Sequence, residues 1–310
     1  MSAAAFPLIG HAEPEARFLK ARHSGRLHHA WILQGPSGIG KSIFAKRVAA
    51  LMLGADALDA SAEDPVMRHV LSQAHPDLIW ISRQNNEKGQ LRQDITVDQI
   101  RSLNQFFALK PALSGWRVGV IDALDDMNVS GLNALLKTLE EPPANAILLL
   151  ISQLEKPVLP TIRSRCQSLR FLPLSAEETK SVLAVHPDQA ALAADLANGR
   201  PGYGLSLATP RAATAAKTAQ QIIESINKSN AGPLAANLAS TIVDESSLQA
   251  FCDRILEWTA EKALNQPVLA RTWLHMSRQQ ADSKALNLTP LQTAAKLVKT
   301  LQNDLQTLPS

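Results

Sequence analysis

The chain has 310 residues, enough for two or three domains, and with 45% hydrophobic and 19% charged residues its composition is typical of a soluble globular protein. The net charge of +3 permits contact with nucleic acid but does not argue for it. Two cysteines, Cys166 and Cys252, exclude a disulfide framework and a four-cysteine zinc site, so we expect a reduced, cytoplasmic protein.

Neither the first residues of the chain nor its longest apolar run indicates a membrane segment. Residues 1–7 lack a basic start followed by an apolar run, so no signal peptide is expected. The longest aliphatic run, residues 146–151, is far too short to span a bilayer. We therefore expect no membrane partner.

Residues 35–42 match the phosphate-binding P-loop pattern, in which Gly and four further residues precede Gly-Lys-Ser. Glycines let backbone N–H groups approach phosphate oxygens closely. Lys41 would reach the β- and γ-phosphates of a nucleotide, and the Ser42 hydroxyl would hold Mg²⁺. The predicted nucleotide-binding residues of the loop are Gly35, Pro36, Ser37, Gly38, Ile39, Gly40, Lys41 and Ser42.

The surrounding sequence has the alternation of strands and helices that a P-loop requires. Residues 30–34 predict a buried strand before the loop, and residues 43–52 predict a helix after it. Further strands are predicted at 78–82, 116–122, 147–152 and 169–172. Strands that are apolar on both faces and separated by helices predict a parallel five-stranded sheet covered by helices, with nucleotide at the carboxyl ends of the strands.

Beyond residue 172 the strand signals stop and helices recur. Ser175 and Glu178 form a predicted capping box at the start of a short helix, and a second short helix is predicted at 189–197. The expected organisation is a P-loop α/β domain at 1–172, a small helical lid at 173–210 and an all-α bundle for assembly at 211–310.

The predicted strand 116–122 ends in Asp122, where P-loop hydrolases carry an acid that helps to hold Mg²⁺. Many such enzymes place a glutamate next, as the base that polarises the attacking water. Here the next residue is Ala123, which cannot accept a proton. Asp125 is a possible substitute, although a residue three positions on is expected to face another direction.

Two further segments carry a family resemblance. Residues 135–143 read Leu-Leu-Lys-Thr-Leu-Glu-Glu-Pro-Pro, and residues 159–166 read Leu-Pro-Thr-Ile-Arg-Ser-Arg-Cys. Together with the P-loop they resemble the sliding-clamp loader branch of the AAA+ ATPases, over the first 172 residues. The lid and the bundle agree with that family in order and size rather than in motif.

The resemblance implies roles for individual residues. Arg165 would be an arginine finger that acts in trans on ATP bound to the adjacent subunit; without the resemblance, Arg163 and Arg165 would be interpreted as solvated charges at a strand edge. Ser152 would read the γ-phosphate. The position of a lid arginine that contacts nucleotide in motor subunits is expected to hold Gly202. Together with Ala123, this implies a weak or inactive ATPase.

The resemblance also implies partners and cofactors. The chain would complete a ring with other loader subunits (delta and gamma/tau) and help to load the sliding clamp onto primed DNA during replication. ATP or ADP with Mg²⁺, held by Ser42 and Asp122, is plausible. Residues 53–76, where related subunits carry a zinc module, contain no cysteine, so no zinc is expected. The alternatives are an ATP-hydrolysing motor subunit of the same loader, or an unrelated P-loop kinase or helicase loader.

Overall fold

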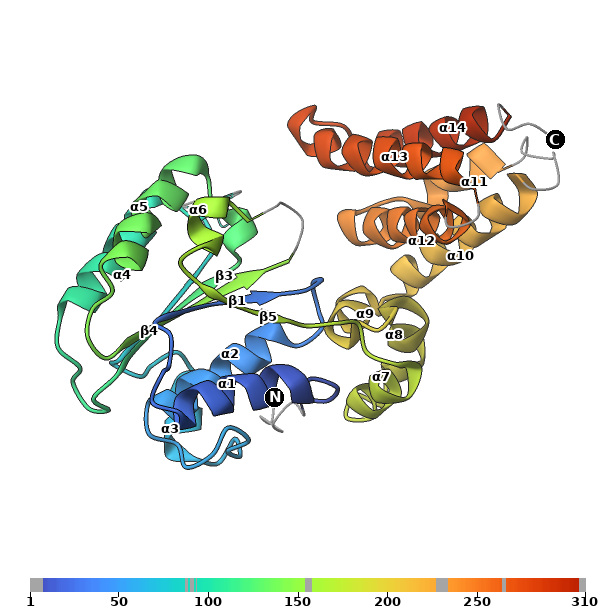
Figure 1. Ribbon diagram of the computed structural model, residues 1–310. Coiled ribbons are helices and arrows are strands. Elements are labelled where there is room, and N and C mark those ends of the chain that lie inside the picture. The colour runs from blue at the N-terminus through green and yellow to red at the C-terminus, as the bar shows by residue number, and fades with distance from the viewer. Residues whose placement is uncertain are drawn as a thin grey trace. The chain divides into compact units, whose positions relative to one another are not determined.

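The computed structural model describes residues 8–306, except 87–88, 90–91, 93, 154–157, 227–233 and 264–265. The chain divides into two compact units. The first comprises the residues up to Val185 together with Asn198–Gly202, and the second comprises His186–Ala197 and Tyr203–Ser310 (Figure 1). In the part of the chain that the structure describes, no helix is long and apolar enough to cross a membrane.

The first unit is built on a five-stranded sheet in the order β2-β3-β4-β1-β5, in which all neighbouring strands are parallel. The predicted parallel five-stranded sheet is therefore confirmed. Strand β5 begins two residues earlier than the sequence predicts. The strands are β1 (Ala30–Gln34), β2 (Leu78–Ser82), β3 (Arg117–Asp122), β4 (Ala146–Ser152) and β5 (Gln167–Arg170).

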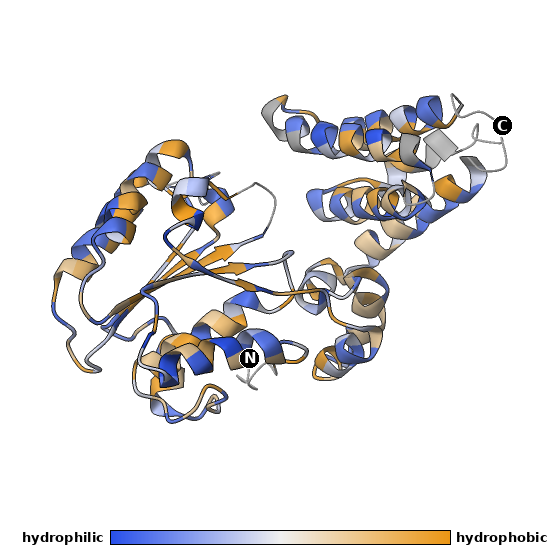
Figure 2. Ribbon diagram, in the orientation of Figure 1, coloured by the Kyte–Doolittle hydropathy of each residue, from blue (hydrophilic) through white to orange (hydrophobic). Residues whose placement is uncertain are grey.

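Helices cover both faces of this sheet (Figure 1). Trp31 and Leu33 of β1 belong to the apolar core shared with α1, α2 and α3. Ala30 and Ile32 of the same strand belong to the core shared with α4, α5 and α6, because successive side chains of a strand point to opposite faces. These helices are α1 (Ala12–His23), α2 (Lys41–Met52), α3 (Pro65–Leu71), α4 (Val97–Ala108), α5 (Val129–Glu140) and α6 (Pro160–Arg163). Figure 2 shows the apolar strands between more polar outer helix surfaces.

Local sequence signals set several helix starts. Thr96 caps α4 and Ser175 caps α7 (Ala176–Leu183), each in a reciprocal capping box with the residue three positions on. The short helices α6 and α9 (Pro201–Leu207) were not predicted. Both begin with proline, which is favoured in the first turn of a helix because its φ angle is already helical.

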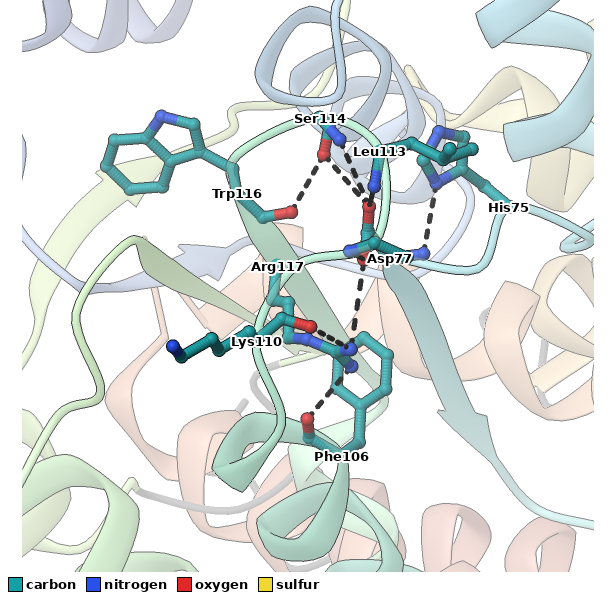
Figure 3. A network of polar contacts seen from close by, with 9 residues as sticks. His75, Asp77, Phe106, Lys110, Leu113, Ser114, Trp116 and Arg117 are labelled. Carbon is teal, nitrogen blue, oxygen red and sulfur yellow. Dashed lines mark hydrogen bonds and ion pairs between the residues drawn. The ribbon is translucent and has the colours of Figure 1, made fainter.

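A buried carboxylate anchors the loop between α4 and β3 (Figure 3). Asp77 is fully buried just before β2, where an ionised carboxylate needs hydrogen bonds and a counter-charge. Burial alone would raise the pKa of Asp77, but hydrogen bonds from backbone amides outweigh it and hold the pKa below its ordinary value. The donors are the backbone N–H groups of Ala112 (2.6 Å), Leu113 (2.8 Å) and Ser114 (3.2 Å), and the Ser114 hydroxyl (3.3 Å).

Arg117 completes this network from the first residue of β3. Its guanidinium lies 3.9 Å from the Asp77 carboxylate and donates to the carbonyl oxygens of Phe106 (2.9 Å) and Lys110 (2.6 Å). It also stacks over the Phe106 ring, 4.4 Å from the ring centroid. The pair thus ties the starts of two strands to the end of α4 (Figure 3).

The second unit is helical in its described residues. Its apolar core includes Phe251 and Ile255 of α12, Met276 of α13, and Leu297 of α14. Thr289 caps α14, and Pro290 occupies the first helical position. The helices of this unit, besides the continuation of α9, are α8 (Ala190–Ala197), α10 (Pro210–Ile226), α11 (Leu234–Thr241), α12 (Glu245–Ala263), α13 (Pro267–Ala285) and α14 (Pro290–Gln306).

Candidate nucleotide-binding site

The predicted P-loop connects strand β1 to helix α2 in the first unit. Gly38 and Gly40 have φ angles of +79° and +106°, a region that side chains other than glycine rarely adopt. The N–H of Gly35 donates to the carbonyl of Ser152 at 3.2 Å, which fixes the start of the loop to the end of β4. The loop therefore has the strand, turn and helix context that the motif requires.

Lys41 is buried within the loop, with 4% of its surface exposed. Its amino group donates to the carbonyl oxygens of Gly35 and Pro36, both at 2.6 Å. These contacts hold a positive charge inside the concave loop, at the N-terminal end of α2, where backbone N–H groups also attract an anion. The donor set of amine, backbone N–H groups and the Ser42 hydroxyl fits a nucleotide phosphate.

Asp122 and Ser152 end the two strands that lie on one side of β1, as the sheet order requires. Burial raises the pKa of the Asp122 carboxyl, while the positive charge of Lys41 acts in the opposite direction. That electrostatic interaction indicates that Asp122 and Lys41 lie close to each other. Ser152 is fully buried and pairs in register with Gln34, the residue before the loop.

Ala123 occupies the usual position of the catalytic base, and Asp125 is the residue considered as its substitute. Ala123 is buried, with 1% of its surface exposed, and offers no proton acceptor on its side chain. Asp125 is also buried, and its carboxylate accepts a hydrogen bond from the Gln153 N–H at 2.7 Å. Asp125 thus links the turn after β3 to the end of β4, next to Ser152.

Two further segments contact the P-loop, and sequence reasoning did not assign the first of them to the site. His11 is buried, and its Nε2 donates to the Ile39 carbonyl at 2.6 Å. Burial lowers the pKa of His11, against the opposing effects of the Ile39 carbonyl and the charge of Glu178. His11 lies 28 residues before Ile39, so no local pattern could have indicated the contact.

The second segment is the start of α9. The Gly202 N–H donates to the Gly38 carbonyl at 2.9 Å. A Cβ atom at position 202 would lie 3.0 Å from that carbonyl oxygen, so the close approach favours glycine. The residue at the expected lid-arginine position therefore lies in the first turn of a helix that contacts the P-loop.

Arg165 lies near the N-terminal ends of the strands, whereas the P-loop lies at the carboxyl end of β1. Strand register pairs Trp31 with Gln167, so Arg165 lies level with the residue before β1, whereas the P-loop follows the end of β1. The separation along the strand direction is about 20 Å, from a rise of about 3.3 Å per residue. Arg165 is therefore outside the group of site residues that the fold brings together in this chain.

The glycine-rich loop after a central parallel strand, with an acid and a hydroxyl at the ends of neighbouring strands, defines a P-loop α/β protein. Residues 10–175 match the protein family described as DNA polymerase III, delta subunit. The chain therefore belongs to this family of DNA polymerase III subunits.

Named relatives agree with this. DNA polymerase III subunit delta' of Pseudomonas aeruginosa is 32% identical over 252 residues, which cover 77% of this chain and 72% of the relative. Subunit delta' of Haemophilus influenzae is 31% identical over 179 residues, or 56% of this chain and 53% of the relative. Ala123, in place of the water-activating acid, resembles a delta-prime subunit, and the names of these relatives confirm that resemblance.

Among solved structures, a DNA polymerase III gamma subunit-related protein of Thermotoga maritima is similar over 92% of this chain and 98% of its own chain. Its sequence identity is 17% and its TM-score 0.45.

Proposed function

We propose that the chain is a delta-prime-type stator of a clamp loader, which completes a ring of AAA+ subunits and supplies Arg165 to ATP bound on a neighbour. The observation that carries this proposal is the position of Arg165, about 20 Å along the strands from its own P-loop. A guanidinium is always charged and forks onto phosphate oxygens, so it is suited to stabilise the transition state of phosphoryl transfer.

The chain's own site is proposed to bind ATP or ADP and to hydrolyse ATP poorly. Lys41 and the backbone N–H groups of residues 35–42 would hold the phosphates, and Ser42 with Asp122 would hold Mg²⁺, whose role is to neutralise phosphate charge. No carboxylate follows Asp122 directly, since Ala123 occupies that position. Gly202, rather than an arginine, contacts the P-loop from α9.

The remaining parts of the proposal concern assembly. Residues 173–210 would act as a lid and residues 211–310 as a collar, and the partners would be delta and gamma/tau subunits, the sliding clamp and primed DNA. The helical core around Phe251, Ile255 and Leu297 supports a stable bundle in the second unit. DNA contact within the complex would depend on backbone charge and shape, with little sequence preference.

An ATP-hydrolysing motor subunit is the second candidate, because the P-loop is intact and Lys41 and Asp122 lie in one region. A gamma subunit of Buchnera aphidicola, 30% identical over 157 residues, is among the relatives. Robust DNA-stimulated ATP turnover by the isolated chain would favour this candidate and contradict the stator proposal. We expect little turnover under conditions where ATP binding is measurable.

Lys41→Ala is expected to abolish ATP binding by the isolated chain, because the amino group is the one side-chain cation within the described P-loop residues. Binding is measured by calorimetry or by a fluorescent ATP analogue. Lys20→Ala, at an exposed position of α1, is the control and should bind ATP within about threefold of the wild type. Unchanged binding by the Lys41 variant would show that this loop does not hold nucleotide.

A further inference from the structure

We propose that Glu140 is a positioning residue that holds the Arg165 side chain in place for the phosphate of the neighbouring subunit. The inference rests on the proposed function of Arg165. A carboxylate oxygen of Glu140 lies 2.9 Å from a terminal nitrogen of the Arg165 guanidinium. The pair joins the two sequence segments that carry the clamp-loader resemblance, which lie on separate elements of the fold.

The guanidinium is held from two directions. One terminal nitrogen donates to the Thr161 carbonyl at 2.8 Å and to the Ser164 hydroxyl at 3.3 Å, both in the turn around α6. The other terminal nitrogen pairs with Glu140 at the end of α5. An arginine side chain is long and loses conformational entropy when it is fixed. Because these contacts already fix it, less entropy remains to be lost when the phosphate binds.

The place of Glu140 on its helix supports a role toward Arg165. Glu140 is the last residue of α5, where the helix dipole is negative and an acidic side chain is unfavourable. Helix stability alone therefore disfavours an acid at this position. The guanidinium of Arg165 supplies the opposite charge that compensates it.

Both partners are accessible to another subunit. The exposed fractions of the two side chains are 36% for Arg165 and 50% for Glu140. A guanidinium carries five N–H donors in one plane, so an edge that faces Glu140 leaves other donors for phosphate oxygens. The geometry therefore lets Glu140 orient Arg165 while a neighbour's phosphate binds it.

Adjacent Glu141 provides a matched control. It is also exposed, and it forms no ion pair with any of the residues that the structure describes. Glu141 therefore has the charge of Glu140 without the contact to Arg165.

The test is single-turnover ATP hydrolysis, over a range of ATP concentrations, by the loader assembled from the full chain and its cognate subunits on primed DNA. Glu140→Gln should lower the maximal rate constant at the neighbouring site about two- to fivefold, the range expected for loss of an exposed ion pair. Glu140→Lys should lower it on the order of tenfold, because a like charge then repels Arg165. KM for ATP should not change, since a finger acts in the transition state. Glu141→Lys should stay within about twofold of the wild type.

The same substitutions in the Arg165→Ala background separate a positioning role from a structural one. If Glu140 acts through Arg165, Glu140→Lys should have no further effect there, which a double-mutant cycle measures directly. An equal loss in both backgrounds, or a loss matched by Glu141→Lys, would overturn the positioning role. If Arg165→Ala itself leaves turnover unchanged, the finger assignment fails instead. Glu140→Gln keeps the side-chain shape, so a loss of rate in this variant cannot be ascribed to misfolding caused by the larger lysine side chain.

Discussion

Replacing Arg165 with alanine is expected to lower the rate of ATP hydrolysis at the neighbouring subunit's site by about 10³–10⁵-fold, the effect of arginine fingers in other phosphoryl-transfer proteins. The reason is electrostatic, because this chain would then supply no cation to the charge that develops on that subunit's γ-phosphate. Single-turnover hydrolysis by the assembled loader on primed DNA is the appropriate measurement, since steady-state turnover averages over all ATP sites of the ring.

Arg163→Ala is the control for this experiment. Arg163 ends α6, is exposed and belongs to the same short segment, so its loss removes one positive charge without removing the proposed finger. It should reduce the rate by less than about fivefold. Equal losses from both variants would indicate a general charge effect and would contradict the assignment of Arg165. The variants should have the same urea midpoint, because the Arg165 ion pair is exposed.

Asp77→Asn is expected to cause the largest loss of stability, about 3–5 kcal/mol in the free energy of unfolding. The substitution removes the counter-charge of the buried Arg117 guanidinium and turns an amide NH₂ group toward backbone N–H donors (Figure 3). Urea unfolding at neutral pH, followed by tryptophan fluorescence, measures the change. Asp98→Asn, which removes an exposed i,i+3 ion pair with Arg101, should change the free energy of unfolding by less than about 1 kcal/mol.

The contribution of Asp77 should also depend on pH. Its pKa in the folded protein is lower than the ordinary value, so its stabilising effect is fully present above about pH 4 and is lost as pH falls through the folded pKa. The difference in unfolding free energy between wild type and Asp77→Asn should therefore shrink on acidification below about pH 4. A difference that stays constant or grows in acid would show that the carboxylate is not stabilised by these hydrogen bonds.

The sequence predicts those parts of the fold that have local signals. Apolar runs bounded by polar residues located β1 and β2 without error, and the spacing of Ser175 and Glu178 marked the start of α7. The P-loop pattern placed Lys41 in its buried loop, since glycine and lysine spacing there follows directly from phosphate geometry. Asp122 was identified from its position at the end of a predicted strand, and Ser152 from the family resemblance.

Contacts between distant segments could not be predicted in this way. The partners of Asp77 come 35–37 residues later, and nothing around Asp77 marks it as a buried acid. The contact between His11 and Ile39 depends on the packing of α1 against the sheet, which no local pattern describes. The start of α9 was not predicted, because residues 199–204 include three glycines, which are unfavourable within a helix. In the structure, the first turn of α9 brings Gly202 against Gly38, and a side chain at Gly204 would collide with the Ala193 carbonyl.

The most direct test compares two loaders that differ only in this chain, one with Lys41→Ala and one with Arg165→Ala, in ATP turnover and clamp loading on primed DNA. We predict that the Lys41→Ala loader retains turnover within about threefold of the wild type, whereas the Arg165→Ala loader is crippled. This result would show that the chain acts on a neighbour's phosphate and does not depend on its own nucleotide. A crippled Lys41→Ala loader together with a normal Arg165→Ala loader would contradict the account.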